Sequence, residues 1–501
     1  MGNISFNSIP TSYRVPGHYI EFSSSRALQG LSVLPNRAII FAPRLTTGTA
    51  AAGVPFQITS GTAGLLGFGR GSIGSLMAQA FVAANPSTEL WGIGIADAGG
   101  GIAATGTLTV TGTATAAGTL ALYVGGISVP VAVAVGDTAT VVGASILAAL
   151  ALIEAPVSAA NLAGVVTFTA LNKGTPGNDI DIRLNYNLGE AIPAGLTAVI
   201  VAMASGATDG SISGAITAIG GTQYNTICSA YRASASLSLI EAELLTRWGP
   251  MQQIEGIVFA ATGGPNSTDA TTGAMATYGL ARNSFNSCVM GIGSSPTPTF
   301  IWAAVVGAVS AAEYAIDPFR PFNTLLLPGV LPPAKNSLII RADRNTLLFD
   351  GISTYTVDKS GACLCDRLIT TYQTTNGFAD ASYLDIMTPR GLAALRYTQR
   401  ARIAIKFPRS KLAADGTEFG PGQPIVTPSL IKSELIALFI EWIAAGWVQG
   451  LAQFKADLLV QINASDPTRV DVLMDPNLVS GFMIYAAQVQ FLLQAPAPSP
   501  S

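Results

Sequence analysis

Residues Gly256–Ala260 (GIVFA), Ser287–Gly291 (SCVMG) and Thr299–Tyr314 (TFIWAAVVGAVSAAEY) set the architecture that this chain is expected to adopt. The first two are short apolar runs of the kind found in buried strands, and the third is long enough for a core helix. Further helices are expected at Leu237–Trp248 and Ser267–Arg282. Strands that alternate with helices form mainly parallel sheets covered on both faces. The sequence therefore predicts an α/β core.

The same alternation begins upstream, where Ala38–Phe41 predicts a strand, Ser72–Ala84 a helix and Glu89–Ile95 another strand. Apolar residues recur every three or four positions in that helix, which gives it one buried face: Ile73, Leu76, Met77, Ala80, Phe81 and Ala84. We assign residues 31–98 and 207–345 to one core.

Residues 99–206 differ from this core in composition, being rich in Gly, Ala, Thr and Val. Gly-rich joints flank them, and surface loops tolerate such insertions. We expect an inserted, outward-facing β-rich domain with one helix, Thr138–Ile153. Its expected strands are Thr107–Thr111, Thr119–Val124, Ile127–Val135, Val165–Leu171, Asp179–Tyr186 and Leu196–Met203.

Residues 346–479 are expected to form a C-terminal α+β domain. It begins with an antiparallel meander turned at Asp350-Gly351 and at Lys359-Ser360-Gly361. Two helices follow, Ala381–Ala404 and Pro428–Trp447. The expected strands are Leu347–Phe349, Thr354–Val357, Cys363–Thr370, Phe454–Asn463 and Arg469–Met474.

The chain ends in GFMIYAAQVQFLLQ (Gly481–Gln494), which reads as one strand before a Pro-rich tail. Side chains alternate along a strand, so one face carries Met483, Tyr485, Ala487, Val489, Phe491 and Leu493. The other carries Phe482, Ile484, Ala486 and Leu492 beside two glutamines.

Burying five or six such side chains gains about 8–18 kcal/mol. Ordering about 14 residues costs roughly 14–28 kcal/mol in backbone freedom. The segment therefore needs main-chain pairing in a sheet, either in another copy of the chain or as an edge strand of its own domain. We predict exchange between copies, with 480–501 as a C-terminal arm and 1–30 as an N-terminal arm. The strand residues expected in the two arms are Tyr19, Ile20, Phe22, Met483, Ile484, Tyr485, Val489, Phe491 and Leu493.

Only 11% of the 501 residues are charged, the mean hydropathy is +0.45 and the net charge is −3. No apolar run reaches the roughly 18–20 residues of a spanning helix, so no membrane insertion is expected. Nucleic-acid binding needs clustered basic residues and is not expected either. A chain that hides much of its surface in an assembly fits this composition, because interface cores are depleted in charge.

No catalytic, cofactor or metal site is predicted. The single histidine, His18, lies in the N-terminal arm rather than in the core. Gly69–Gly74 matches G-x-G-x-x-G, but no strand is expected directly before it, as a dinucleotide site requires. Cys363 and Cys365 lack further metal ligands and are expected to be buried thiols. Acidic pairs such as Asp380 with Asp385, and Asp466 with Asp471 and Asp475, are typical of turns and caps.

Several stretches, spread over nearly the whole chain outside the insert, resemble phage tail sheath proteins of the Mu-like contractile-tail group. They are VPFQITS (Val54–Ser60), FGRGS (Phe68–Ser72), MAQAFVAANPSTELWGI (Met77–Ile93), DPFRPFNTLLLPGVLPP (Asp317–Pro333), LFDGISTYTVD (Leu348–Asp358), RLITTYQT (Arg367–Thr374), SYLDIMTPRGLAALR (Ser382–Arg396) and DPTRVDVLMDPNLV (Asp466–Val479).

This resemblance implies a core of subtilisin-like topology, without a catalytic triad. It also implies hexameric rings that stack helically around a tail tube, linked by arm strands that join a shared sheet on the C-terminal domain. Contraction would drive the tube through the host envelope without nucleotide hydrolysis. The implied partners are other copies, the tube, baseplate and tail terminator proteins, with assembly in the host cytoplasm and residence in the virion.

The helix Pro428–Trp447 is a candidate for contact with the tube, through Lys432, Glu434 and Glu441. Its apolar residues Ile431, Leu435, Leu438, Phe439 and Trp442 are expected to pack inward. An ordinary amphipathic surface helix is the alternative. Two other functions stay open at this point: the sheath of a phage-derived bacteriocin or secretion machine, and an α/β hydrolase.

Overall fold

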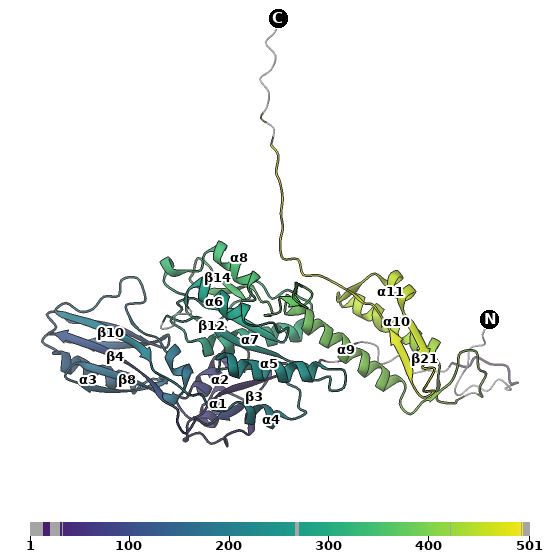
Figure 1. Cartoon of the computed structure of the whole chain (residues 1–501), viewed down its shortest axis with the longest axis horizontal. Coiled ribbons are helices and arrows are strands. Elements are labelled where there is room, and N and C mark those ends of the chain that lie inside the picture. The colour runs from purple at the N-terminus through teal and green to yellow at the C-terminus, as the bar shows by residue number, and fades with distance from the viewer. Residues whose placement is uncertain are drawn as a thin grey trace, which may run out of the picture. The chain divides into compact units, whose positions relative to one another are not determined.

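The computed structural model describes residues 14–20, 31–32, 34–265, 270–420, 422–491 and 493. The chain divides into two compact units (Figure 1). The larger is Pro35–Ala394 with Ser480–Ser501, and the smaller is Met1–Leu34 with Leu395–Val479. Several separate sheets and interspersed helices make this a mixed α/β protein.

A six-stranded sheet forms the centre of the larger unit, in the order β13-β12-β11-β1-β3-β2. Five neighbouring strands are parallel and only the edge strand β2 is antiparallel, so the predicted mainly parallel sheet is confirmed. Every residue of β11, β12 and β13 is buried, which requires cover on both faces. The bounds are β1 Arg37–Pro43, β2 Pro55–Ile58, β3 Glu89–Ile95, β11 Thr226–Ser229, β12 Ile257–Thr262 and β13 Ser287–Gly291.

Six helices pack around this sheet. They are α1 Gly61–Phe68, α2 Ile73–Ala84, α4 Ser213–Ile219, α5 Ser234–Trp248, α6 Thr272–Leu280 and α7 Thr299–Ile316. Among the helices in the described ranges, α7 alone is long and apolar enough to cross a membrane, and 72% of it is buried inside the protein. It approaches the sheet closely at Gly307, where an added Cβ would lie 2.4 Å from Sγ of Cys228.

The insert forms two sheets. A four-stranded antiparallel sheet has the order β10-β4-β8-β7, and a three-stranded sheet has the order β6-β5-β9. The elements are β4 Ala103–Gly112, β5 Gly118–Val124, β6 Ile127–Val133, α3 Ala139–Leu150, β7 Val157–Leu162, β8 Val165–Lys173, the 3-10 helix η2 Thr175–Asp179, β9 Ile182–Leu184 and β10 Leu196–Ala204. Strand β7 was not predicted, and β9 is much shorter than Asp179–Tyr186.

Buried polar contacts fix the insert to the core. The carboxylate of Asp179 accepts hydrogen bonds from Nε and Nη2 of Arg232, both at 3.0 Å, and another from Oγ1 of Thr299 at the start of α7. Oδ1 of Asn172 accepts from the first amide of α2, the N–H of Ile73, at 2.9 Å. Charged pairs with this geometry are directional, so the insert is held in one orientation on the core.

Downstream of the central sheet, the predicted meander is a two-stranded hairpin of β14 (Thr354–Val357) and β15 (Cys363–Arg367). The prediction of a strand at Leu347–Phe349 is wrong, because these residues end helix α8 (Arg341–Phe349). Leu347 is fully buried there in the apolar core. The other elements before the smaller unit are η4 Lys335–Ser337, β16 Thr374–Thr375 and β17 Phe378–Ala379.

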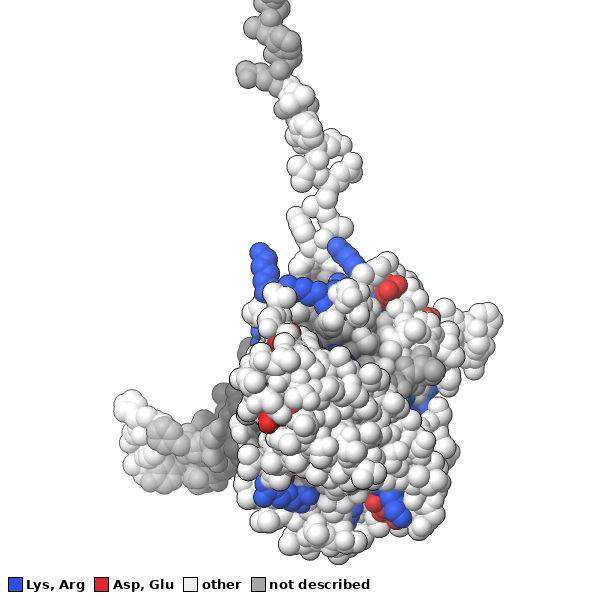
Figure 2. Space-filling model, turned by 90° about the vertical axis from the view of Figure 1, so that its left-hand side faces the viewer, with Lys and Arg blue, Asp and Glu red and all other residues white. Residues whose placement is uncertain are grey.

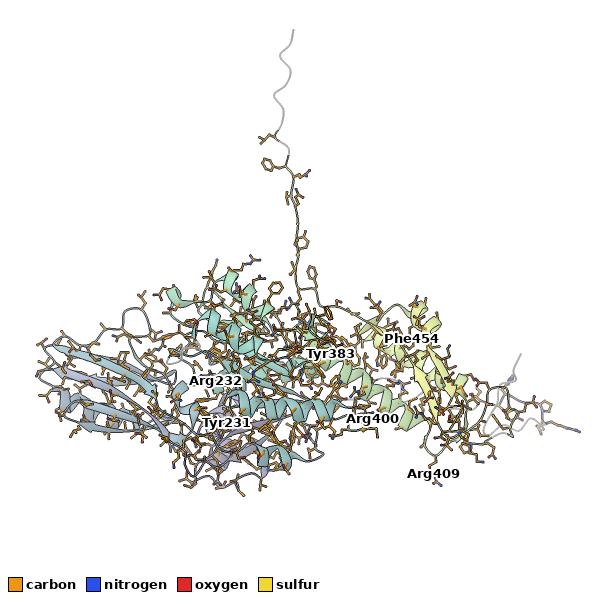
Figure 3. The ribbon with its side chains drawn as sticks, in the orientation of Figure 1. Tyr231, Arg232, Tyr383, Arg400, Arg409 and Phe454 are labelled. Atoms are coloured by element: carbon orange, nitrogen blue, oxygen red, sulfur yellow. The ribbon has the colours of Figure 1, made fainter. Side chains whose placement is uncertain are left out.

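Helix α9 (Met387–Lys406) leads into the smaller unit, whose core is built on α10 (Pro428–Ala444). The rings of Phe439 and Phe454 stack at 3.8 Å between centroids; Phe454 is labelled in Figure 3. The prediction of a strand over Phe454–Asn463 is wrong in its first half, which belongs to α11 (Leu451–Asp457). The strands of this unit are β18 Lys411–Leu412, β19 Ile425–Val426, β20 Val448–Gln449, β21 Leu459–Ile462, β22 Val470–Leu473 and β23 Asn477–Leu478.

Candidate assembly site

The C-terminal segment is attached to the larger unit at its first residues. An added Cβ on Gly481 would lie 2.8 Å from Cγ of Pro321 and 3.0 Å from Sδ of Met387, so the backbone passes close to the body here. Met483 is half-buried and packs against the apolar cluster that lies under β12 and β13. Met483 is therefore placed as an anchor on its own chain. The exchange role predicted for it stays a prediction.

Beyond this anchor the segment is exposed. The exposed fractions of Ile484, Tyr485, Val489, Phe491 and Leu493 lie between 77% and 84%. Residues 481–491 form no strand within the described chain, and Figure 1 draws the segment without a neighbouring ribbon. The alternative of an edge strand in its own domain therefore does not describe these residues. What remains is a run of apolar side chains and unpaired backbone groups, a template for pairing with another chain.

The predicted N-terminal arm strand falls partly outside the described residues. Tyr19 and Ile20 are described and exposed, without strand structure at 14–20, while Phe22 lies outside the described ranges. Their role in assembly stays a prediction.

The hairpin sheet β21–β22 in the smaller unit could accept such a strand. Its register runs from Leu459 opposite Leu473 to Ile462 opposite Val470. In the described part of the chain each of the two strands pairs only with the other, so both outer edges are open. Leu473 is 66% exposed at one of these edges. An open edge beside exposed apolar side chains favours β-strand addition.

On α10, the predicted inward packing of the apolar residues is confirmed, since all five are buried. The polar candidates differ from one another. Glu441 is ion-paired with Nη2 of Arg402, and Glu434 lies 3.7 Å from Nη1 of Arg402 and 3.8 Å from Nζ of Lys406. Lys432 has no ion pair among the described side chains. Of the three, Lys432 has the charge least engaged within its own unit.

Sequence reasoning missed Arg402 altogether. This residue is 39 positions from Glu441, and only the packing of α9 against α10 brings the two together. The only local sign of such pairing was the repeated occurrence of basic residues along α9, among them Arg396, Arg400 and Lys406.

The features that bear on a possible active site are the glycine-rich stretch Gly69–Gly74, the single histidine His18 and the metal-ligating side chains. The stretch Gly69–Gly74 follows helix α1 and not a strand, and Ser72 caps α2 by accepting from the N–H of Ser75 at 3.0 Å. It therefore lacks the strand-loop-helix context of a dinucleotide site. His18 is exposed. No cluster of three metal-ligating side chains occurs within the described ranges.

The acidic pairs and the cysteines have structural roles. Asp385 pairs with Arg367 through two contacts of 2.8 Å, and Asp466 caps its own turn at Thr468. All four cysteines are free and buried, which confirms the prediction for Cys363 and Cys365. Burial raises the pKa of the Cys288 and Cys363 thiols to about 12, which makes them unreactive near neutral pH.

Comparisons with known proteins identify the family. The model of the phage tail sheath protein central domain matches residues 205–370, and that of the phage tail sheath C-terminal domain matches residues 379–492. The Mu-like prophage FluMu tail sheath protein of Haemophilus influenzae is 41% identical over 494 residues, covering 98% of this chain and 100% of that protein. The chain belongs to the Mu-like phage tail sheath family. It is a structural, non-enzymatic subunit of a contractile tail sheath and resides in the virion. The alternative of an α/β hydrolase is therefore excluded.

Solved sheath structures match this chain at low identity. The sheath complex of an extracellular contractile injection system in its contracted state matches with a TM-score of 0.50 and 10% identity, over 96% of this sheath chain and 98% of that chain. A sheath tail protein from Desulfitobacterium hafniense matches with a TM-score of 0.47 and 15% identity, over 92% and 100% of the two chains.

Proposed function

We propose that this sheath subunit polymerises by strand exchange, in which the segment from Ile484 onward adds to the β21–β22 sheet of a neighbouring copy. The observation that carries the proposal is the segment's condition in the single chain: anchored at Met483, and exposed and unpaired from there to Phe491. The two open edges of β21–β22 offer the main-chain partners that the segment lacks.

A balance of free energies supports pairing with a sheet rather than loose docking on a surface. Ordering the ten residues from 484 to 493 costs roughly 10–20 kcal/mol in backbone freedom. Burying five large apolar side chains returns about 8–15 kcal/mol. Each main-chain hydrogen bond adds about 0.5–1.5 kcal/mol, and a sheet edge supplies several of them. Side-chain burial alone is therefore marginal, while strand addition is favourable.

The assembly that follows has hexameric rings stacked helically around a tail tube, with baseplate and tail terminator proteins as further partners. Contraction rearranges the rings and drives the tube through the host envelope. The exchanged strands keep neighbours joined during this rearrangement, because each strand stays paired with the neighbouring sheet while its own chain continues into the next subunit's body. In this proposal the N-terminal arm strand, with Tyr19, Ile20 and Phe22, extends the same shared sheet.

The proposal also covers the topology of the core, the orientation of the insert and the contact with the tube. The core has the subtilisin-like topology that the resemblance implied, and the insert at 99–206 faces outward. The α10 face contacts the tube mainly through Lys432, because Arg402 and Lys406 already pair with Glu434 and Glu441. We keep the division into a core of residues 31–98 with 207–345 and a C-terminal domain of residues 346–479.

Truncation combined with electron microscopy tests the proposal. Deleting residues 484–501 leaves the Met483 anchor in place, while deleting 495–501 removes only the tail beyond the predicted strand and serves as the control. The control and the full chain should form hollow striated cylinders, and the 484–501 deletion should remain a folded monomer. Normal cylinders from the 484–501 deletion would refute strand exchange through this arm.

A further inference from the structure

The insert presents an uncharged face of its four-stranded sheet to solvent. Alternate residues of each strand point away from the insert's core and line up in cross-strand rows. One row is Val199, Thr109, Val165 and Leu162, and the next is Val201, Thr107, Thr167 and Ala160. Val199 and Val201 are 65% and 60% exposed. We call these two rows the outer sheet face.

A second uncharged face lies on the other side of the insert. Helix α3 packs Val142, Ile146 and Leu150 into the insert's core, which the inward residues of the sheet, such as Leu108 and Phe168, also line. Its solvent side carries no charged residue. The exposed residues there are Thr140, Val141, Ala144 and Ala148, and we call them the outer helix face. Because α3 covers the inner side of the sheet, the two outer faces point in opposite directions.

Charged residues of the insert lie elsewhere. Strands β4, β7 and β10 and helix α3 contain none, and β8 contains only Lys173 at its end nearest the core. Figure 2 views the side of the molecule where Figure 1 places β4, β10 and α3, and most of its surface there is white. Isolated soluble domains keep charges on exposed faces, whereas interface cores are depleted in them.

The size of the outer sheet face indicates what covers it. Four strands about 4.8 Å apart, with six or seven residues at about 3.4 Å each, give roughly 400 Å². A stable complex between free partners buries about 800 Å² on each side. A face half that size binds usefully only when other contacts hold its partner nearby. Within a polymer of this chain, that partner is a neighbouring copy.

Helical polymers need contacts between two different surfaces, since a self-complementary patch would close into a dimer. The insert offers such a pair, on opposite sides and equally free of charge. We propose that the outer sheet face of one insert packs against the outer helix face of the next insert along the sheath. This inference rests on the proposed polymer and assigns the insert an assembly role within it. The contacts of Asp179 with Arg232 and Thr299 hold the insert in the orientation that such packing requires.

Cross-linking in assembled sheaths tests this contact. The four native cysteines are buried, so engineered thiols are the accessible ones. A chain with both Val199→Cys and Ala148→Cys, assembled and treated with a short bis-maleimide, should give a ladder of covalent multimers on a denaturing gel. Each single variant, treated in the same way, should give none.

The outcomes separate this inference from the proposed function. Cylinders that form normally but give no ladder would overturn the insert contact and leave strand exchange standing. Dimers from Val199→Cys alone, as abundant as those from the double variant, would also overturn it, because they require sheet face to meet sheet face. If the unmodified chain forms no cylinders, both proposals fail.

Charge substitution provides an independent measurement. Val199→Lys places one cation on the outer sheet face, and burial without a partner would disfavour it strongly. We expect assembled sheaths of this variant to dissociate at a lower denaturant concentration, with each insert contact weakened more than about tenfold. Leu188→Lys, in the loop before β10 and fully exposed, is the matched control and should behave like the unmodified chain. Equal stability of all three sheaths would contradict the proposal.

Discussion

Replacing Val489 and Phe491 with serine should weaken assembly without weakening the subunit. These side chains are 84% and 78% exposed in the single chain, so their loss removes no core contact and should leave the unfolding midpoint of the monomer unchanged. In an exchanged strand both lie on one face and are buried by the neighbour. Losing them should cost about 1.5–3 kcal/mol each, or about 3–6 kcal/mol together. That is about two to four powers of ten in the association constant at each exchange.

The matched control replaces Gln488 and Gln490, which alternate with them on the opposite face, also with serine. The assay is the protein concentration at which cylinders first appear, measured by sedimentation and electron microscopy. The valine–phenylalanine variant should need a concentration at least about a hundredfold higher, and the glutamine variant should stay near the unmodified value. Equal effects of the two pairs would refute the one-sided burial of this strand, and no effect of either would refute its burial altogether.

Three further predictions concern the folded subunit. Gly307→Ala should destabilise the larger unit by about 1–3 kcal/mol in chemical unfolding, because the added methyl would meet Sγ of Cys228 at 2.4 Å; an unchanged midpoint would show that α7 can shift freely. Trp442→Phe should lower the stability of the smaller unit by about 1–3 kcal/mol, since it leaves Oγ1 of Thr398 without its 3.0 Å donor inside the core; a calorimetric shift confined to the larger unit would contradict this. The Cys363 thiol, with its pKa raised to about 12, should be about one part in ten thousand thiolate at pH 8; rapid alkylation of the folded chain, followed by mass spectrometry, would disprove its burial.

The core could be predicted from sequence where the periodicity was long and clear. Strand β3 and helix α2 lie where the apolar spacing placed them, the helix starting one residue later than expected. Predictions made from shorter sequence patterns were less accurate. The run Leu347–Phe349 is too short to show a period, and the following turn favoured a strand, yet these residues end helix α8 with Leu347 buried. The stretch Gly61–Gly67 was expected to be a loop or a short helical turn, and it forms helix α1, in which Gly64 and Gly67 allow close contact with Ala78 and Phe56.

The assembly residues were only partly accessible to sequence reasoning. The alternation after Gly481 identified an apolar strand, but the pattern could not show that Met483 anchors it to its own chain. From the sequence alone, the charged residues of α10 are expected to be free to contact a partner. In the structure, Arg402 lies beside Glu434 and Glu441. Contacts between residues distant in sequence leave no local pattern, so they become visible only in the structure. The open edges of β21–β22 are a property of the same kind.

Amide hydrogen exchange at residues 484–491, compared between monomer and assembled sheath, measures strand exchange most directly. In the monomer these amides have no strand partner among the described residues and should exchange at rates close to those of an unfolded peptide. In cylinders we expect strong protection in this segment, together with new protection along an outer edge of β21 or β22. Exchange in cylinders as fast as in the monomer would contradict the account.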